Sequence, residues 1–552
     1  MTSIPANTET RSRVQRPGGD TPAERADSAA AFVRKYRWLI LAGLVTAAVM
    51  EILDTTIINV ALPQMAGNLG ATQEEIGWVS TGYILANVIF LPMTAFMTLR
   101  FGRRRYLTFS ILLFIVASFF CGTSHSLAEL VIWRIVQGAG GAALLSTAQA
   151  TLRQIFPREE QGLVQAVFLL GVIVAPTLGP TLGGWITDNY TWNWCFFINV
   201  PIGLLSTFLV TTFLLDPPDQ QARRGAIDWL GIALLTVGVG GLQYVLEEGN
   251  KKDWFDDALI FRLAVLAGIS LAVMVWWEMN ERNRNPVVNF HVLKNRTLAA
   301  SLFLFVALGF GLFGGVFLFP LFAQGILGFT PTATGLVMMP GGLATAFSAL
   351  ICGMLLNGAK PKADPRFLIA GGVVLFAISM WIMGHLSTAA GISDVRTALL
   401  IRGFGLGLLF VPINNVAYAS IKPHEAQQAA GLINLSRQLG GAFGIAILAN
   451  YVNKQTAFHR VDLVASVKNG NLLGEGRLAA LTHGFAGKGM DAIHAHQAAL
   501  AVMSGQLQKQ AAMLSFNDSW IFVLIVFAVV SPAILLLQKP EVGAPAVAGE
   551  AH

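Results

Sequence analysis

Apolar residues in this chain gather into long, almost unbroken runs, and polar residues are confined to short segments between them. About 20 consecutive apolar residues is the length that a helix needs to cross a bilayer. The pattern predicts an all-α polytopic membrane protein with about fourteen transmembrane helices. The runs cover residues 38–62, 74–98, 104–122, 127–152, 160–185, 195–215, 227–247, 258–279, 297–322, 332–356, 366–387, 395–419, 427–452 and 517–537.

Two parts of the chain resemble each other in sequence. P-R-E-E-Q at residues 157–161 and P-H-E-A-Q at residues 423–427 each open a predicted span, and Arg134 and Arg402 match in the fourth and twelfth spans. A repeat of two six-helix halves is typical of transporters that bind substrate between the halves.

The repeat and the composition of the ends together divide the chain into units. Residues 1–37 carry no periodicity and are predicted to be a disordered cytoplasmic tail. The remaining predicted units are a first half (38–215), two inserted transmembrane helices (216–296), a second half (297–537) with a periplasmic loop at 454–516, and a cytoplasmic tail (538–552).

Lys and Arg fall mainly in alternate loops between the predicted spans. Examples are Arg34 to Arg37, Arg100 to Arg105, and Lys360 to Arg366, whereas the intervening short loops are nearly free of them. The exception holds Lys251 and Lys252, which nearby aspartates offset. The positive-inside rule then predicts that both termini are cytoplasmic, which agrees with an even number of spans.

Composition excludes several other functions. The chain is 54% hydrophobic and 12% charged, with a mean hydropathy of +0.60. The net charge of +6 lies in loops between apolar runs, so we expect no nucleic-acid partner. Three scattered cysteines make no C-x-x-C motif, and no histidine has a partner at helical spacing within a span. We therefore expect no metal, no cofactor and no enzyme activity.

Charged residues inside the spans are the candidate functional groups. Glu51 and Asp54 lie three residues apart in the first span and share one helix face. Arg134 in the fourth span lies at a similar depth, counted from the flanking charged loops. Because a membrane-embedded charge needs a partner, we expect Asp54 or Glu51 to accept hydrogen bonds from Arg134. Arg stays protonated, so the acid would carry the transported proton. A purely structural ion pair is the alternative.

Two further motifs are rich in glycine. Gln137 and Gly138 follow Arg134 in the fourth span. The fifth span contains Gly171, Pro176, Gly179, Pro180 and Gly183, followed by a further glycine. Glycines allow close approach of helices, and prolines bend a helix where neighbours satisfy the freed backbone groups. We expect these residues to shape a substrate cavity and its closure; generic packing is the alternative.

These motifs resemble the major facilitator superfamily, in its fourteen-span drug:proton antiporter branch of the EmrB type. The resemblance covers residues 38–540. It rests on L-D-T-T-I-I-N-V-A-L-P at 53–63, R-I-V-Q-G at 134–138, every fixed position of G-x-x-x-x-P-x-x-G-P-x-x-G-G at 171–184, and W-N-W-C-F-F-I-N-V-P at 192–201. It implies a proton-coupled exporter of hydrophobic drug-like compounds in a bacterial inner membrane. An exporter of one specific endogenous metabolite or siderophore is the alternative.

One motif departs from the superfamily pattern. The loop after the second span contains Arg100, Gly102, Arg103 and Arg104, but Leu99 stands where the superfamily has an acid. A charge relay through that acid is therefore in doubt, although the basic cluster and the glycine remain.

The long loop 454–516 contains an apolar heptad pattern. Ile493, Leu500, Leu507 and Leu514 recur every seven residues and predict an amphipathic helix. It could be a lid on the outer face or a docking element. The resemblance implies a periplasmic membrane-fusion adaptor and an outer-membrane channel as partners, beside the lipid bilayer, protons and hydrophobic small molecules.

Charged residues within the spans help to predict the charge of the substrate. Arg402 and Arg437 lie within spans, where Glu51 and Asp54 are the acids away from helix ends. We therefore expect neutral or weakly acidic substrates rather than dications. Three rivals fit less well: a nutrient symporter lacks the motif at 171–184, a redox enzyme needs paired metal ligands, and an assembly protein needs no intramembrane charges.

Overall fold

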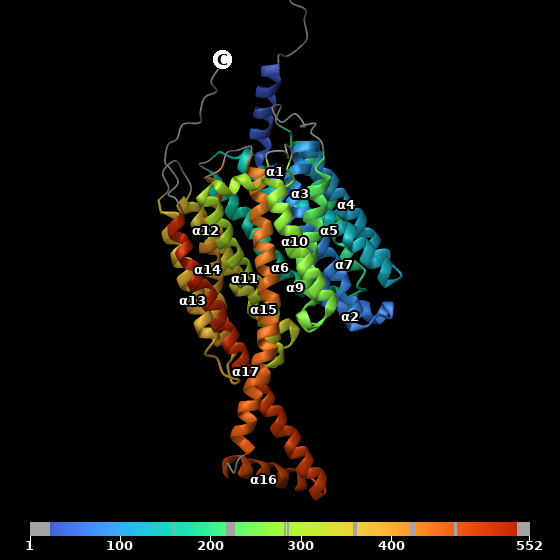
Figure 1. Ribbon diagram of the computed structural model, residues 1–552, viewed down its shortest axis with the longest axis vertical. Coiled ribbons are helices and arrows are strands. Elements are labelled where there is room, and N and C mark those ends of the chain that lie inside the picture. The colour runs from blue at the N-terminus through green and yellow to red at the C-terminus, as the bar shows by residue number, and fades with distance from the viewer. Residues whose placement is uncertain are drawn as a thin grey trace, which may run out of the picture.

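The protein folds into a bundle of long helices that run in a common direction (Figure 1). The computed structural model describes residues 22–157, 160–216, 227–280, 283, 286–356, 362–419, 421, 425–468 and 472–537. Every regular element in these ranges is helical. The helices are α1 (Pro22–Leu69), α2 (Gln73–Ile76), α3 (Trp78–Phe101), α4 (Arg103–Thr123), α5 (Leu127–Ile155), α6 (Gln161–Asn189), α7 (Trp194–Phe197), α8 (Asn199–Phe213), α9 (Trp229–Glu248), α10 (Ala258–Glu278), α11 (Arg296–Gly325), α12 (Pro331–Leu356), α13 (Pro365–Met383), α14 (Ile392–Ala419), α15 (Ala426–Lys468), α16 (Leu472–Ala486) and α17 (Ala492–Val530).

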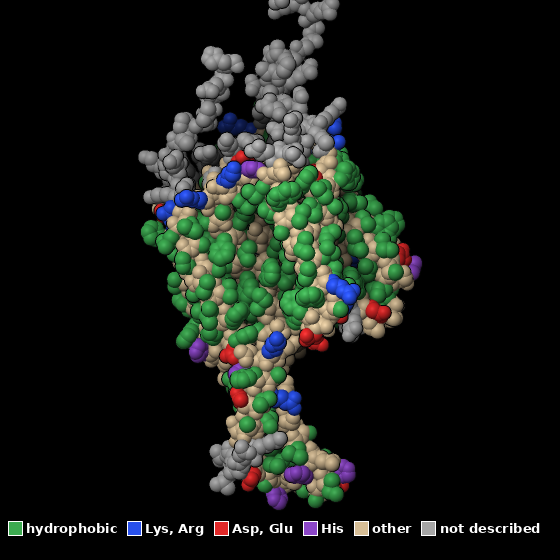
Figure 2. Space-filling model, viewed as in Figure 1, with side chains coloured by type: hydrophobic (Ala, Val, Ile, Leu, Met, Phe, Trp, Pro, Cys, Tyr) green, Lys and Arg blue, Asp and Glu red, His purple; other side chains and the backbone are tan. Residues whose placement is uncertain are grey.

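The predicted fold class is confirmed. Thirteen helices in the described ranges are long and apolar enough to cross a membrane. The 29-residue helix α6 stands where the fifth span was predicted. Figure 2 shows hydrophobic side chains over the middle of the body and Lys and Arg along its upper rim, so this is a multi-pass membrane protein.

Short polar side chains begin several of these helices at the loops. Ser126 accepts a hydrogen bond from the third residue of α5, Asp257 caps α10, and Asp364 caps α13 with a proline at its first position. Such caps satisfy backbone N–H groups that have no partner within the helix. The loops therefore fix where the helices begin, and the apolar runs fix how far they extend.

The predicted disordered tail is wrong for residues 22–37, because α1 already begins at Pro22. Proline suits the first turn of a helix, and the following residues include many alanines, the best helix formers. Residues 1–21 and the predicted tail 538–552 lie outside the described residues, as do Lys360 and the motif residues 158, 159, 423 and 424.

The loop 454–516 forms a helical stalk, made of the ends of α15 and α17 with α16 across the tip (Figure 1). The lid interpretation is wrong, since the stalk projects away from the body. No glycine or proline interrupts residues 453–468, so α15 continues outward. The predicted helix is present, as the start of α17. The first two residues of the heptad stripe are not on its packed face: Ile493 and Leu500 are 70% and 46% exposed, whereas Ala495 and Ala499 are buried, and Leu507 and Leu514 are partly buried.

We call the end of the body at which α1 enters the terminal end, and the opposite end the stalk end. Helices α1 to α8 pack mainly against one another, as do α11 to α17, and α9 packs mainly against α10. We call the first group the first half and the second group the second half; the stalk extends from α15 and α17. The seams between the halves are α3 with α15 and α6 with α12.

Candidate functional site

Asp54 of α1 and Arg134 of α5 form an ion pair inside the first half. The distance from Arg134 Nη1 to Asp54 Oδ2 is 2.6 Å, and the two side chains are 1% and 0% exposed. Counting residues from the charged loops had placed these two groups at a similar depth, and the structure shows them in contact. A buried pair of this kind is costly to break, because the remaining charge has no partner.

Other donors and acceptors complete the surroundings of the ion pair. Arg134 Nε donates to the carbonyl of Val79 at 2.9 Å, and Arg134 Nη1 also donates to Gln137 Oε1 at 2.7 Å. The guanidinium lies 4.3 Å from the ring centre of Tyr83, within the range of a cation–π contact. Arg134 is thus held by helices α3 and α5 as well as by its acid.

The second oxygen of Asp54 accepts from two amides. Gln137 Nε2 donates to Asp54 Oδ1 at 3.1 Å, and Asn199 Nδ2 of α8 donates to the same oxygen at 2.7 Å. Both amides are buried. The carboxylate therefore has three donors from two helices. Asn199 belongs to the W-x-W-x-F-x-I-N-x-P motif, but nothing in its sequence spacing indicated that it reaches Asp54.

Glu51 is also buried, one helical turn from Asp54, but it has different partners. It accepts from Asn87 Nδ2 of α3 at 3.2 Å and from the backbone N–H of Leu145 at 3.1 Å. Asn87 Oδ1 in turn accepts from Gln438 Nε2 of α15 at 3.0 Å. Glu51 is therefore connected, through one amide, to the second half of the protein.

The two halves are joined along α15 by two more hydrogen bonds. Gln427 donates to Thr147 at 3.2 Å, and Asn434 donates to Gln149 at 3.0 Å. These donors belong to the first turns of α15, next to the terminal end. Thr147 and Gln149 belong to α5, so the helix of Arg134 is itself part of the seam.

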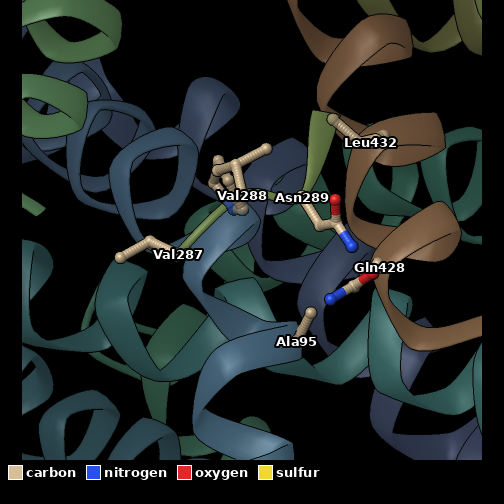
Figure 3. A pocket seen from close by; sticks show the side chains of 7 residues that line it. Ala95, Val287, Val288, Asn289, Gln428 and Leu432 are labelled. Atoms are coloured by element: carbon tan, nitrogen blue, oxygen red, sulfur yellow. The ribbon is translucent and has the colours of Figure 1, made fainter. Parts of the chain in front are cut away.

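The linker between α10 and α11 covers the same seam. Val287 to Asn289 lie against Ala95 of α3 and Gln428 of α15, and Figure 3 shows the Asn289 and Gln428 side chains pointing toward each other. The cavity between them is about 10 Å³, room for one water molecule at most. The halves are thus closed together at this point of the terminal end.

The second half contributes two buried arginines. Arg402 is 9% exposed and lies beside Gly315 of α11, whose missing side chain leaves space for the guanidinium. Arg437 donates to Asn434 Oδ1 at 3.1 Å and lies 5.6 Å from the ring centre of Phe410. Within the described ranges, neither has a carboxylate in salt-bridge contact.

The glycine motif of α6 packs directly against α1. A side chain at Gly171 would lie 2.9 Å from Val45 and from Val49, one at Gly179 would overlap Thr56, and one at Gly183 would lie 2.8 Å from the Ile57 carbonyl. Pro176 is partly buried in the same helix, and the side chain of Pro180 lies outside the described residues. The motif therefore forms a seam along the helix that carries Glu51 and Asp54.

This seam gives a matched pair of variants. Gly179→Ala should reduce folded, membrane-inserted protein, because its methyl group meets Thr56 and overpacking of a close contact costs about 1–3 kcal/mol. Gly184→Ala should be tolerated, since nothing lies within 4 Å of the added atom. Thermal unfolding in detergent would measure both, and equal stabilities would contradict the close packing of α1 and α6.

Gly138 has the same role between α3 and α5. A side chain at this position would overlap the carbonyl of Tyr83. The close approach lets Arg134, one turn away, reach the neighbouring carbonyl of Val79. Gln137 and Gly138 are thus adjacent residues with separate functions, one polar and one steric.

The loop motif between α3 and α4 is contacted by an acidic residue from a distant part of the chain. Gly102 has φ +86°, which favours glycine, and Asp216 Oδ1 accepts from the backbone N–H of Arg104 at 2.8 Å. Arg103 is buried and donates to Gln154 Oε1 at 2.6 Å. Arg100 ends α3 beside this glycine. Asp216 lies 112 residues from Arg104, so no local motif could identify it.

The described residues contain no group of three or more His, Cys, Asp or Glu side chains that could hold a metal ion. Cys121, Cys195 and Cys352 are buried free thiols. The acidic groups of this site are two buried carboxylates that contact side chains of neighbouring helices.

Comparisons with known proteins agree with this arrangement. Residues 44–445 match the family described as Major Facilitator Superfamily. The chain is 34% identical to "Multidrug export protein EmrB" of Haemophilus influenzae, over 78% of this chain and 83% of that protein. It is 31% identical to the protein of the same name from Escherichia coli K12, over 92% and 96% of the two chains.

A solved structure supports the fold alone. The human organic anion transporter MFSD10 superposes with a TM-score of 0.57 at 13% identity, covering 89% of this chain and 99% of that one.

Proposed function

We propose that this chain, which belongs to the Major Facilitator Superfamily, is a proton-coupled antiporter that exports hydrophobic drug-like compounds across a bacterial inner membrane. The buried ion pair of Asp54 and Arg134 carries the proposal. Ionisable residues inside a membrane are expensive and typically belong to ion pathways or proton relays. The multidrug export proteins among its relatives support the drug-like cargo.

The terminal end faces the cytoplasm in this proposal, and the stalk lies in the periplasm. The Lys and Arg side chains at the rim of the terminal end support this orientation, because cytoplasmic loops carry the excess of positive residues. Both termini are then cytoplasmic.

Transport requires the seam at the terminal end to open and close. Asp54 takes a proton, loses its charge and releases its hold on Arg134 of α5, a helix that α15 contacts through Thr147 and Gln149. Glu51 is the second coupling acid, since its partner Asn87 binds Gln438. Protonation thereby favours one arrangement of the halves over the other, which is all that coupling requires.

The motif residues provide the scaffold for this change. Gln137 and Gly138 hold α5 against α1 and α3, and Gly171, Pro176, Gly179 and Gly183 hold α6 against α1. Movement at α1 is therefore transmitted to two neighbouring helices without an intervening layer of side chains.

Charge within the spans indicates the substrate class. The first half offers two acids that must also carry protons, and the second half offers Arg402 and Arg437. A dication would need two carboxylates, so little charge remains to hold it. We infer that neutral or weakly acidic lipophiles are the main substrates.

A resistance panel in a pump-deficient bacterial strain would test this proposal. Expression should raise tolerance about tenfold or more to neutral and weakly acidic lipophiles, the factor for about 1.4 kcal/mol of selective binding. It should leave tolerance to lipophilic dications unchanged. Resistance to dications alone, abolished by Glu51→Gln, would contradict the charge argument. Tolerance to a single metabolite only would favour the specific exporter.

The stalk is proposed to dock a periplasmic membrane-fusion adaptor, which an outer-membrane channel would complete. Its exposed Ile493 and Leu500 support this proposal, since outward apolar residues mark interaction sites. Serine at both positions should lower resistance in cells but leave proton movement in purified vesicles unchanged. Unchanged resistance in cells would show that these two residues do not contribute to docking.

A further inference from the structure

Asn199 stands at the start of α8 and reaches Asp54 from a helix that carries none of the charged groups. Its Nδ2 donates at 2.7 Å to Asp54 Oδ1 and at 3.1 Å to Ser118 Oγ of α4. Ser118 in turn donates to the carbonyl of Phe196 at 2.9 Å. The side chains of Asp54, Ser118 and Asn199 are buried. Both hydrogens of the Asn199 amide nitrogen therefore have an acceptor.

The oxygen end of the same amide has no partner. Asn199 Oδ1 is buried and accepts no hydrogen bond from any residue in the described ranges. A buried acceptor without a donor is costly. Such an atom beside a proton-binding carboxylate needs a physical explanation.

Gln137 faces the same oxygen of Asp54 but cannot serve in the same way. Its Nε2 donates to Asp54 Oδ1 while its Oε1 accepts from Arg134 Nη1 at 2.7 Å. Turning this amide would bring its nitrogen against the guanidinium, two groups that only donate. Gln137 is therefore fixed as a donor. Asn199 is not fixed in this way, because no donor in the described ranges holds its Oδ1.

We propose that Asn199 is the positioning residue that serves Asp54 in both of its protonation states. With Asp54 ionised, Asn199 Nδ2 donates to the carboxylate, as observed. When a proton binds at Asp54 Oδ1, the new O–H needs an acceptor, and a half-turn of the amide brings Asn199 Oδ1 into that place. The proton stays on Asp54, and no covalent bond of Asn199 changes.

Among the side chains that hydrogen-bond to Asp54 in the described ranges, only Asn199 has an acceptor atom that no donor occupies. Arg134 of α5 has only donors and contacts the other oxygen. Tyr83 of α3, Cys121 of α4 and Cys195 of α7 lie within electrostatic reach of Asp54, as does Glu51 of α1. None of these four makes a hydrogen bond to Asp54 in the part of the chain that the structure describes.

The proposal rests on the proposed function, since it takes Asp54 as the acid that binds the proton. Infrared difference spectra of the full-length protein between acid and alkaline pH would test it without transport. The band of the protonated Asp54 carboxyl is identified by its loss in Asp54→Asn. If no such band exists, the proton assignment of the proposed function fails, whatever Asn199 does.

Asn199→Leu keeps the size of the side chain but removes both donor and acceptor. The infrared band of the protonated Asp54 carboxyl should shift toward the frequency of a carboxyl group whose O–H donates no hydrogen bond. The transport rate should fall about tenfold, the factor for one lost hydrogen bond to a charged group. The pH of half-maximal transport should move by less than about half a unit, because the variant loses a partner in both states.

Two comparison variants complete the design. Asn199→Thr retains a hydroxyl that donates and accepts, so it should keep transport within about threefold of wild type. Asn193→Leu makes the same change in the same motif, where the amide donates to the carbonyl of Gly122, and should keep the wild-type carboxyl band.

Two results would overturn the proposal. If Asn199→Leu left the carboxyl band in place and moved the pH of half-maximal transport up by a full unit, Asn199 would be a fixed donor like Gln137. If Asn199→Thr folded but lost transport as completely as Asn199→Leu, the side chain would act through packing alone.

Discussion

Asp54→Asn should insert and fold normally but reduce proton-driven export to the level of empty vesicles. Asparagine has the size and the hydrogen-bonding oxygen of aspartic acid but cannot exchange a proton. Arg134 would keep its bonds to Val79 and Gln137 and its contact with Tyr83, so the fold should tolerate the change. Substrate binding to the purified variant should remain measurable, since no substrate group depends on this proton.

Asp364→Asn is the matched control for this prediction. Asp364 caps α13 by accepting from the N–H of Arg366 at 3.0 Å, and asparagine caps helices equally well. This variant should transport at the wild-type rate. Wild-type proton movement in Asp54→Asn would show that Asp54 is not the coupling acid and would leave Glu51 as the remaining buried acid of α1.

Arg134→Ala should shift the pH of half-maximal transport upward by about 1–3 units, the effect of removing an opposite charge in contact with an acid. Asp54 would then hold its proton without an opposing cation. The loss of a buried partner should also cost about 3–5 kcal/mol of stability, so transport must be normalised to folded protein.

Arg134→Lys should rescue only part of this loss. The ammonium carries the charge but lacks the planar fork that reaches Asp54, Gln137 and the carbonyl of Val79 together. A pH profile of transport in each variant is the measurement. A wild-type profile in Arg134→Ala would mean that the ion pair is structural.

The fold was predictable because a bilayer sets the length of apolar sequence that a helix needs to cross it. Long apolar runs are local signals, and they located the spans that the structure shows as helices. The first tail and the stalk were misjudged where local composition was ambiguous. In the stalk, small residues such as Ala495 form the packed face, while the larger Ile493 faces outward, so counting large apolar residues selected the wrong stripe.

The ion pair was predictable because depth in a membrane can be counted from the loops. The neutral amides were not predictable in the same way. Asn199 lies 145 residues from Asp54, and Gln438 lies 351 residues from Asn87. A neutral amide within a span carries no charge that demands a partner, so only the packing of helices reveals which acid it serves.

The most direct test of the central claim is proton movement in proteoliposomes under an imposed pH gradient. Purified protein is reconstituted, an interior dye reports pH, and a weakly acidic lipophile is added after the gradient is set. Wild-type vesicles should show substrate-dependent collapse of the gradient, saturating with substrate, and Asp54→Asn vesicles should show none. Substrate accumulation without any proton movement in the wild type would contradict the claim that this protein is a proton-coupled exporter.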